Sequence, residues 1–549
     1  MIFISILTLI VAKALPSFNS NLSPIYFTRI SAIIFLYAGA LSFNALYIQS
    51  IGSGIGIYSG LFHVTQISAL IETFLLIIGS LILIAWPLIQ KNYKTYINYC
   101  TDYSLIVLFS TLGATLLISS SDLVSMYLSI ELQSFGLYVL STLYRDSESS
   151  TSAGLKYFLL GGLSSCLILL GAGLIYAFTG LTNFESIYSL ISVSEVNYII
   201  QGLSLGLVII IVGFLFKIAA APLHNWSPDV YDDTPTIVTI WLTIMPKISI
   251  LILLLELITQ IGFIGGLTSL TISSSGYVEL FGLAANINLD LSNLSYISAL
   301  NIIGTDNSIN LLKNLLLISS ILSLIIGTVV GLAQTKIKRL LAYSTISHIG
   351  FILLALAINT EQSIDSLIFY IIQYSITNLN IFLIIIALSY VINNQKIKDL
   401  NIKDIRFIAE LKGQFFSNPI LSLSLAICLF SMAGIPPLIG FFSKQFVLYS
   451  AVQSGYNFIA LVAILVSVVS ASYYLKIVKV LYTENTVEET TNTEALPSVQ
   501  EGVASSATIL TNFHSFLIST LTLSILFFIL KPSLILNSTQ LLSLSLFNF

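Results

Sequence analysis

The sequence predicts an all-α protein that crosses a membrane many times. Of its 549 residues, 56% are apolar and only 8% are charged, and its mean hydropathy is +0.96. A typical soluble domain has about 25% charged residues, so a chain with this composition needs lipid around it. At about 20 residues for each span, there is room for about 14 transmembrane helices. The apolar runs and the placement of the basic residues support this number.

Three helices are predicted in the N-terminal part, residues 1–98, with apolar runs at 2–16, 26–49 and 65–90. No basic stretch precedes the first run, and the run lacks the Arg-rich pattern of an imported precursor. We therefore interpret it as a transmembrane helix rather than a targeting segment. The glycine-rich segment 52–60 lacks the strand and helix that flank a nucleotide site, so we expect a loop there.

Residues 99–260 are predicted to form a first repeat of five helices, over 101–121, 122–144, 153–178, 201–221 and 234–260. Pro222 follows Lys217 by five residues. Because proline has no amide hydrogen and clashes with the preceding turn, we expect the fourth helix to break there. A broken helix frees backbone carbonyl groups, which a membrane tolerates only where they line a polar cavity.

Residues 309–483 are predicted to form a second repeat, over 309–333, 338–358, 364–392, 415–450 and 455–482. Pro436 and Pro437 interrupt its fourth helix. Because each repeat has an odd number of spans, the second is inverted relative to the first, as in many transporters. Two opposed half-channels that meet near the middle of the membrane follow from this plan.

The other segments are weakly apolar. Residues 261–308 are rich in Gly, Ser and Asn, and we expect a non-helical insertion outside the membrane. Residues 484–508 carry five glutamates and are predicted to form an acidic loop. Residues 509–549 are predicted to contain the last helix, at 509–531, and a tail.

The basic residues predict an orientation. Fifteen of the 21 Lys and Arg residues fall in, or face, the loops that follow odd-numbered helices. Such loops lie on the inner side of a membrane. Both termini are then expected on the opposite side.

Charged side chains within the predicted spans are the candidate functional residues. Each costs about 2.5–3.5 kcal/mol at the centre of a spanning helix, and packing alone does not require one. We expect a role in proton transfer for Glu131, Lys156, Lys217, Lys247, His348 and Lys444. The alternatives are buried ion pairs and, for lysines, side chains that extend to the surface. Lys156 remains open between pairing with Glu131 and extending to the surface, and a structural role for His348 also remains open.

The sequence gives no sign of a metal or redox site. Its three cysteines and four histidines are dispersed, without CxxC or zinc spacing. We therefore expect no cofactor and no metal on this chain. A net charge of −4 gives no indication of nucleic-acid binding.

One segment resembles a family signature. The stretch KIAAAPLHNWSPDVYDDTPT, residues 217–236, is similar to the subunit 2 family among the antiporter-like subunits of respiratory complex I, the proton-pumping NADH:ubiquinone oxidoreductase. In the family pattern P-x-H-x-W-x-P-D-V-Y is followed by an acidic-Gly pair, and here Asp233 replaces the glycine. Further similar segments are ELQSFGLYVL (131–140), LKYFLLGG (155–162), KRLLAYSTISHIG (338–350), LKGQFFSNP (411–419) and GIPPLIGFFSKQFVL (434–448). The resemblance runs from about residue 100 to 480.

The resemblance implies a proton-translocating subunit of the membrane arm, with the roles of Glu131, Lys156, Lys217, Lys247 and Lys444 carried over. It implies FMN and iron–sulfur clusters in partner subunits, membrane-arm neighbours, and contact with lipid, protons and internal water. It also implies the mitochondrial inner membrane and an organelle gene, with both termini in the intermembrane space. A subunit of a cation/proton antiporter is the alternative, because the family includes such proteins. A purely structural scaffold is a third hypothesis, which the buried charges disfavour.

Overall fold

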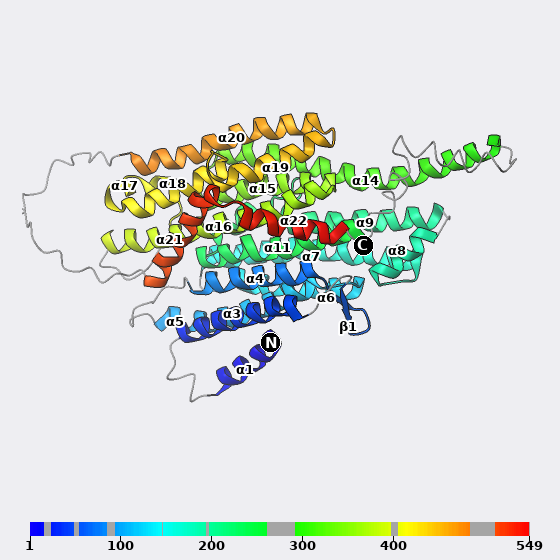
Figure 1. Cartoon of the computed structure of the whole chain (residues 1–549). Helices are drawn as coiled ribbons and strands as arrows, with labels where there is room; N and C mark the ends of the chain where they lie inside the picture. The colour runs from blue at the N-terminus through cyan, green and yellow to red at the C-terminus, as the bar shows by residue number, and fades with distance from the viewer. Residues whose placement is uncertain are drawn as a thin grey trace, which may run out of the picture.

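The computed structural model describes residues 1–15, 24–48, 54–84, 94–144, 147–193, 197–260, 291–396, 404–483 and 511–547. Within these ranges the chain is almost entirely helical, and most helices run along one common direction (Figure 1). Among the described residues, ten helices are long and apolar enough to cross a membrane. Four shorter apolar helices accompany them, at Ile2–Ala14, Asp102–Ile118, Gly202–Lys217 and Pro419–Ala433. These helices coincide with the predicted spans, so the prediction of a polytopic all-α membrane protein is confirmed.

The N-terminal helices are α1 (Ile2–Ala14), α3 (Pro24–Ile48) and α4 (Gln66–Ile84). Between α3 and α4 lies a short antiparallel hairpin of β1 (Ile55–Ile57) and β2 (Phe62–Val64). The expectation of a simple loop at residues 52–60 is therefore wrong. Tyr58, Ser59 and Gly60 have positive φ angles, of 53°, 58° and 85°, in the four-residue loop that joins the two strands.

The first predicted repeat consists of α5 (Lys94–Ile118), α6 (Leu123–Ser141), α7 (Glu148–Thr179), a broken helix, and α11 (Thr236–Gln260). The broken helix comprises α9 (Asn197–Lys217) and α10 (Trp226–Asp233). A short helix, α8 (Phe184–Val193), lies between α7 and α9 and was not predicted. Helices α7 and α9 pack closely: a Cβ atom added to Gly171 would lie 2.6 Å from the carbonyl oxygen of Gly206. Small residues allow this approach between membrane helices.

The second predicted repeat consists of α14 (Leu291–Leu332), α15 (Ile337–Ile358), α16 (Glu361–Lys396), a broken helix, and α20 (Asn457–Tyr482). The broken helix comprises α18 (Pro419–Ala433) and α19 (Ile439–Gln453). The 3₁₀ helix η2 (Ile408–Leu411) and α17 (Gln414–Ser417) precede it. The prediction that all of 261–308 is non-helical is wrong, because α14 begins at Leu291. Apolar residues recur every three positions there (Leu291, Leu294, Ile297, Leu300), which continues the helix. Residues 261–290 lie outside the described residues, as does the predicted acidic loop at 484–508.

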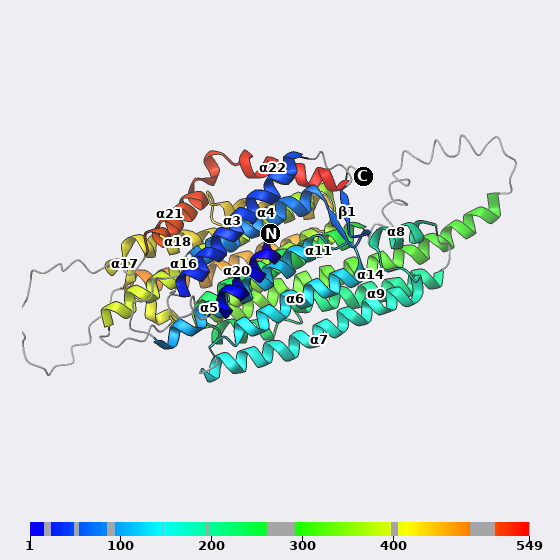
Figure 2. The ribbon, with the colours of Figure 1, turned by 90° about the horizontal axis from the view of Figure 1, so that it is seen from below.

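The C-terminal segment contains α21 (Asn512–Leu526), η3 (Phe527–Leu530) and α22 (Ser533–Phe547). The sequence analysis expected only a tail after residue 531, so α22 is a third correction. This helix lies on the surface of the bundle against α16 and α4 (Figure 2). Helices α11, α15 and α16 form the centre of the protein and are almost wholly buried.

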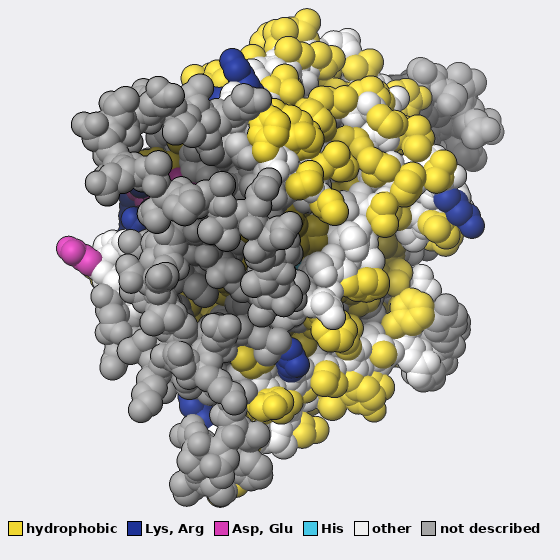
Figure 3. Space-filling view, turned by 90° about the vertical axis from the view of Figure 1, so that its left-hand side faces the viewer, with side chains coloured by type: hydrophobic (Ala, Val, Ile, Leu, Met, Phe, Trp, Pro, Cys, Tyr) yellow, Lys and Arg dark blue, Asp and Glu magenta, His cyan; other side chains and the backbone are white. Residues whose placement is uncertain are grey.

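Successive helices run in opposite directions, so the connections alternate between two ends of the bundle (Figure 1). One end holds the beginnings of α7 and α15 and the end of α20. We call it the basic end, because Lys156, Lys336, Arg339, Lys412 and Lys479 lie there. Figure 3 views this end and shows several Lys and Arg side chains around it. The odd-numbered loops of the sequence analysis therefore share one end of the molecule.

Candidate functional site

The first broken helix is interrupted where the sequence predicts it. Helix α9 ends at Lys217 and α10 begins at Trp226, with Pro222 between them. The carbonyl groups freed by the break are partly satisfied locally. The indole nitrogen of Trp226 donates to the carbonyl oxygen of Phe216 at 2.9 Å. His224 Nδ1 lies 3.3 Å from the carbonyl oxygen of Pro222, in keeping with a structural role for this histidine.

Lys217 and Glu131 form a buried pair beside this break. The Nζ atom of Lys217 lies 3.5 Å from Oε1 of Glu131 and donates to Oγ of Ser134 at 3.2 Å. The two charged side chains are only 7% and 15% exposed. The lysine that pairs with Glu131 is therefore the one at the end of α9. Lys156 pairs with a different carboxylate, as described below.

A small cavity adjoins the pair. It leaves about 20 Å³ for the centre of a water molecule, which is enough for about one ordered water. Gln133, Ser134 and Lys217 are among its polar lining residues, and Pro246 reaches it from α11. The amide of Gln133 donates to Oγ of Ser249 on α11 at 2.9 Å. Polar contacts therefore lead from the first pair towards the helix that carries Lys247.

Lys247 lies at the centre of the protein, after Pro246 within α11. It is 3% exposed, and its Nζ atom donates to the hydroxyl of Tyr374 at 3.3 Å. The rings of Tyr231 and Tyr374 lie 5.6 and 5.7 Å from this ammonium group, which favours the cation. Within the described part of the chain, no carboxylate forms an ion pair with Lys247. Within the described residues, Lys247 is therefore surrounded by two tyrosine rings and has no salt-bridge partner.

His348 on α15 connects the surrounding tyrosines. Its Nδ1 atom lies 2.7 Å from the hydroxyl of Tyr370, and its Nε2 atom lies 3.2 Å from that of Tyr474. Its ring centroid is 6.0 Å from that of Tyr374, which holds Lys247. A fully buried imidazole with both nitrogens in contact with hydroxyl groups can pass a proton between them. The same contacts also satisfy a purely structural histidine.

Lys444 is held by the second broken helix. Helix α18 ends at Ala433 and α19 begins at Ile439, with Pro436 and Pro437 in the break as predicted. The Nζ atom of Lys444 donates to the carbonyl oxygens of Met432 and Ala433 at 2.9 and 3.0 Å. These carbonyls form the negative end of α18, which stabilises an ammonium group. The break thus provides the binding site for its own lysine.

Lys156 belongs to a separate cluster at the basic end. It forms an ion pair with Asp229 of α10, and Arg339 of α15 binds the same carboxylate. Asp232 of α10 accepts from Lys336 at 2.5 Å. Burial raises the pKa of Asp229, but the two cations outweigh this and lower it below its usual value. The sequence analysis did not single out Asp229 or Arg339, because charges near a helix end carry no signal of their own.

The arrangement is a row of titratable groups through the centre of a membrane protein. The side chains of Lys217, Lys247 and Lys444 are each buried and each hydrogen-bonded, and His348 lies within electrostatic range of Lys247 and Lys444. Protonatable groups linked through hydroxyls and room for water can conduct protons. The described residues contain no group of three or more His, Cys, Asp or Glu side chains that is suited to a metal ion.

Comparisons with known proteins agree with this architecture. The family model for "NADH:quinone oxidoreductase/Mrp antiporter, TM" matches residues 120–294 and 281–470. The chain is 48% identical to NADH-ubiquinone oxidoreductase chain 2 of Rhizopus oryzae, over all of both proteins. It is similar in fold to a chain of an archaeal respiratory complex, the membrane-bound sulfane sulfur reductase (TM-score 0.73, 21% identity, 99% of this chain and 96% of that one). A chain of respiratory complex I from Thermus thermophilus is also similar (TM-score 0.64, 24% identity, 98% and 99%).

Proposed function

The chain belongs to the NADH:quinone oxidoreductase/Mrp antiporter family of membrane subunits, and from this premise we propose that it is a proton-translocating subunit of the membrane arm of respiratory complex I. The observation that carries the proposal is the row of buried groups along the protein's centre, in a chain that is 48% identical to a chain 2 over its full length. Partner subunits of the complex would oxidise NADH and reduce ubiquinone.

Each buried group has a role in the proposed path. Lys217, paired with Glu131, accepts a proton through the small cavity beside the first break. The proton passes to Lys247 and then, by way of Tyr374 and His348, towards Lys444. Loss of the Glu131 contact weakens the hold of Lys217 on its proton, because an opposite charge stabilises the protonated lysine. Movement of this carboxylate is therefore the step that allows onward transfer.

Lys156 has a different role in this proposal. Its ion pair with Asp229 lies at the basic end, outside the row of central groups. It holds α10 against α7 near the first break. No redox cofactor is assigned to this chain, and FMN and iron–sulfur clusters would belong to partner subunits. The basic end would face the mitochondrial matrix, with both termini on the intermembrane-space side.

The experiment that tests the proposal begins with native electrophoresis of gently solubilised membranes. The chain should migrate with a large band that oxidises NADH, as mass spectrometry would establish. Lys217→Met should then lower proton pumping in membrane vesicles while the complex still assembles. A chain that migrates alone or with a few small membrane proteins, and whose transport depends on Na⁺, would instead be an antiporter subunit. The family description covers both kinds of protein.

A further inference from the structure

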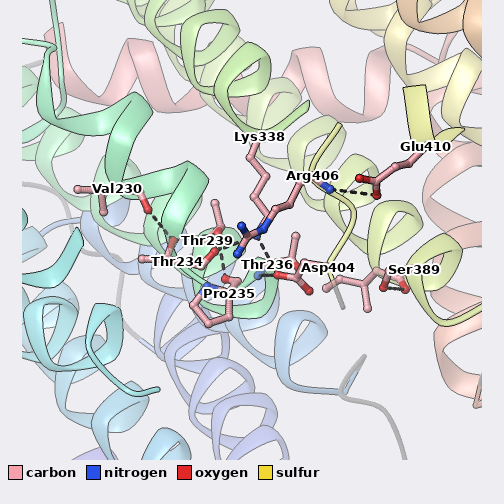
Figure 4. Close-up of polar contacts among 11 residues, drawn as sticks. Val230, Thr234, Pro235, Thr236, Thr239, Lys338, Ser389, Asp404, Arg406 and Glu410 are labelled. Atoms are coloured by element: carbon pink, nitrogen blue, oxygen red, sulfur yellow. Dashed lines mark hydrogen bonds and ion pairs between the residues drawn. The ribbon is translucent and has the colours of Figure 1, made fainter. Parts of the chain in front are cut away.

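Asp404 joins elements that carry the central groups. It lies in the segment that leads from α16 to the second broken helix, at the basic end (Figure 4). Its Oδ2 atom accepts from the backbone N–H of Thr236 at 2.9 Å and from Nζ of Lys338 at 2.8 Å. Thr236 is the first residue of α11, and Lys338 is the second residue of α15. A single carboxylate oxygen therefore binds the first turns of both helices.

Lys338 extends this contact to a third element. The Lys338 side chain is 3% exposed, and its ammonium group also donates to the carbonyl oxygen of Thr234, the residue that follows α10. Burial raises the pKa of Asp404, but Lys338 and the N–H of Thr236 outweigh it and bring the pKa below its usual value. A carboxylate at the N-terminus of α11 also interacts favourably with the helix dipole. The contact is thus both an ion pair and a helix cap.

The segment around Asp404 is itself held in place. The N–H of Ile337 donates to the carbonyl oxygen of Arg406 at 3.0 Å, and that of Ile408 donates to Thr335 at 3.1 Å. Ile405 and Ile408 are buried, with exposures of 2% and 4%. The segment therefore runs alongside the beginning of α15 as a short paired stretch. Asp404 is presented to α11 from a fixed backbone rather than from a free loop.

The contact of Asp404 with α11 and α15 affects the relative depth of Lys247 and His348, which these two helices carry. Lys247 follows Thr236 by eleven residues, and His348 follows Lys338 by ten. At about 1.5 Å per residue, both lie about 15–17 Å from the helix ends that Asp404 binds. A shift of either helix along its axis at the basic end would change the relative depth of Lys247 and His348. Tyr374, which bonds Lys247 and contacts the His348 ring, requires these two depths to match.

We propose that Asp404 is a positioning residue for proton transfer, which fixes the first turns of α11 and α15 and thereby aligns Lys247 with His348. This inference rests on the proposed function. Lys338 takes part in this positioning, because its ammonium group pairs with Asp404 and donates a hydrogen bond at the end of α10. Neither residue touches the central row itself.

The test compares substitutions in the assembled complex in membrane vesicles, with the ratio of protons pumped to NADH oxidised as the readout. Asp404→Ala should lower this ratio at least two-fold, and Asp404→Glu, which keeps an acceptor for both partners, should restore it. The double swap Lys338→Asp with Asp404→Lys should remain defective, because a lysine cannot accept from the Thr236 N–H and is unfavourable at a helix N-terminus. If the swap restores the ratio, the helix cap on α11 has no functional role and only the charge pair matters, which contradicts the proposal.

Glu410 provides a matched control on the same segment. It is half-buried, and in the described part of the chain its carboxylate accepts hydrogen bonds from the N–H groups of Arg406 and Phe407, both at 3.3 Å, and from none in α11 or α15 (Figure 4). Glu410→Gln should leave the ratio unchanged. If Asp404→Ala prevents assembly, Asp404→Leu, which has a similar volume but no hydrogen-bond acceptor, takes its place, and a normal ratio in that variant refutes the proposal. Native electrophoresis and Lys217→Met are measured alongside: a chain that migrates apart from the NADH-oxidising band refutes the proposed function, whereas a pumping defect in Lys217→Met with normal Asp404 variants refutes only this inference.

Discussion

The Lys217–Glu131 pair allows a quantitative prediction about how two buried groups act together. For opposite unit charges 3.5 Å apart, Coulomb's law gives about 5 kcal/mol at an effective dielectric constant of about 20. The loss of hydration on burial offsets much of this. We therefore expect a coupling energy of about 1.5–3 kcal/mol, within the range for residues in contact. That corresponds to about a 10- to 150-fold effect on a rate.

The perturbation is a double-mutant cycle of Lys217→Met and Glu131→Gln. Each single variant should lower proton pumping about ten-fold or more, because each leaves the other charge buried without its partner. The double variant should pump at least as well as the less active of the two single variants, because it removes both charges together. Pumping is measured as acidification of vesicles with a pH-sensitive dye, normalised to the assembled complex. Glu148→Gln, at an exposed acid that begins α7, is the matched control.

Three results would contradict this reasoning. If the two single effects multiply in the double variant, the residues act independently and the pair has no functional meaning. Normal pumping in Lys217→Met would remove the assigned role of Lys217 altogether. A loss of assembled complex in a single variant, restored in the double variant, would place the coupling in folding rather than in transfer, and it would contradict the prediction about pumping.

Three further predictions concern packing, the central histidine and pH. Gly440→Ala should strongly reduce the amount of assembled complex, because the new Cβ atom would lie 1.8 Å from the carbonyl oxygen of Ser431. Gly162→Ala, with no atom within 4 Å of the new Cβ atom, should be tolerated. Blue-native gels of the two variants test this comparison. His348→Ala should lower pumping several-fold while NADH oxidation with uncoupler falls less; equal losses of both would indicate a structural role. Because the pKa of Asp229 is lowered, its ion pairs stabilise the protein above its unfolded pKa of about 3.8 and are lost only as the pH falls through the folded value. Asp229→Asn should therefore lower thermal stability equally at pH 6 and pH 8, and a loss seen only at pH 8 would contradict this assignment.

The sequence by itself determined that the protein lies in lipid, where its membrane-spanning helices are, and where two of them break. Apolar runs of membrane length need no tertiary context, because burial in lipid is decided locally by composition. Pro222, Pro436 and Pro437 each remove a backbone donor, so the interruptions between α9 and α10 and between α18 and α19 were also predictable. Lysines within spans were identifiable as candidates because their cost in a membrane is intrinsic to the side chain.

The tertiary structure decided which groups meet. Lys217 and Glu131 are 86 positions apart along the chain, and both Lys156 and Lys217 were available to pair with that carboxylate. Only the tertiary arrangement places Glu131 of α6 beside Lys217 at the end of α9 and leaves Lys156 to Asp229. The contact of Asp404 with Thr236 and Lys338 gave no sequence signal either, because a polar residue near a helix end has the same cost wherever its partner lies. Pairing depends on geometry over long separations, and composition and periodicity carry no information about it.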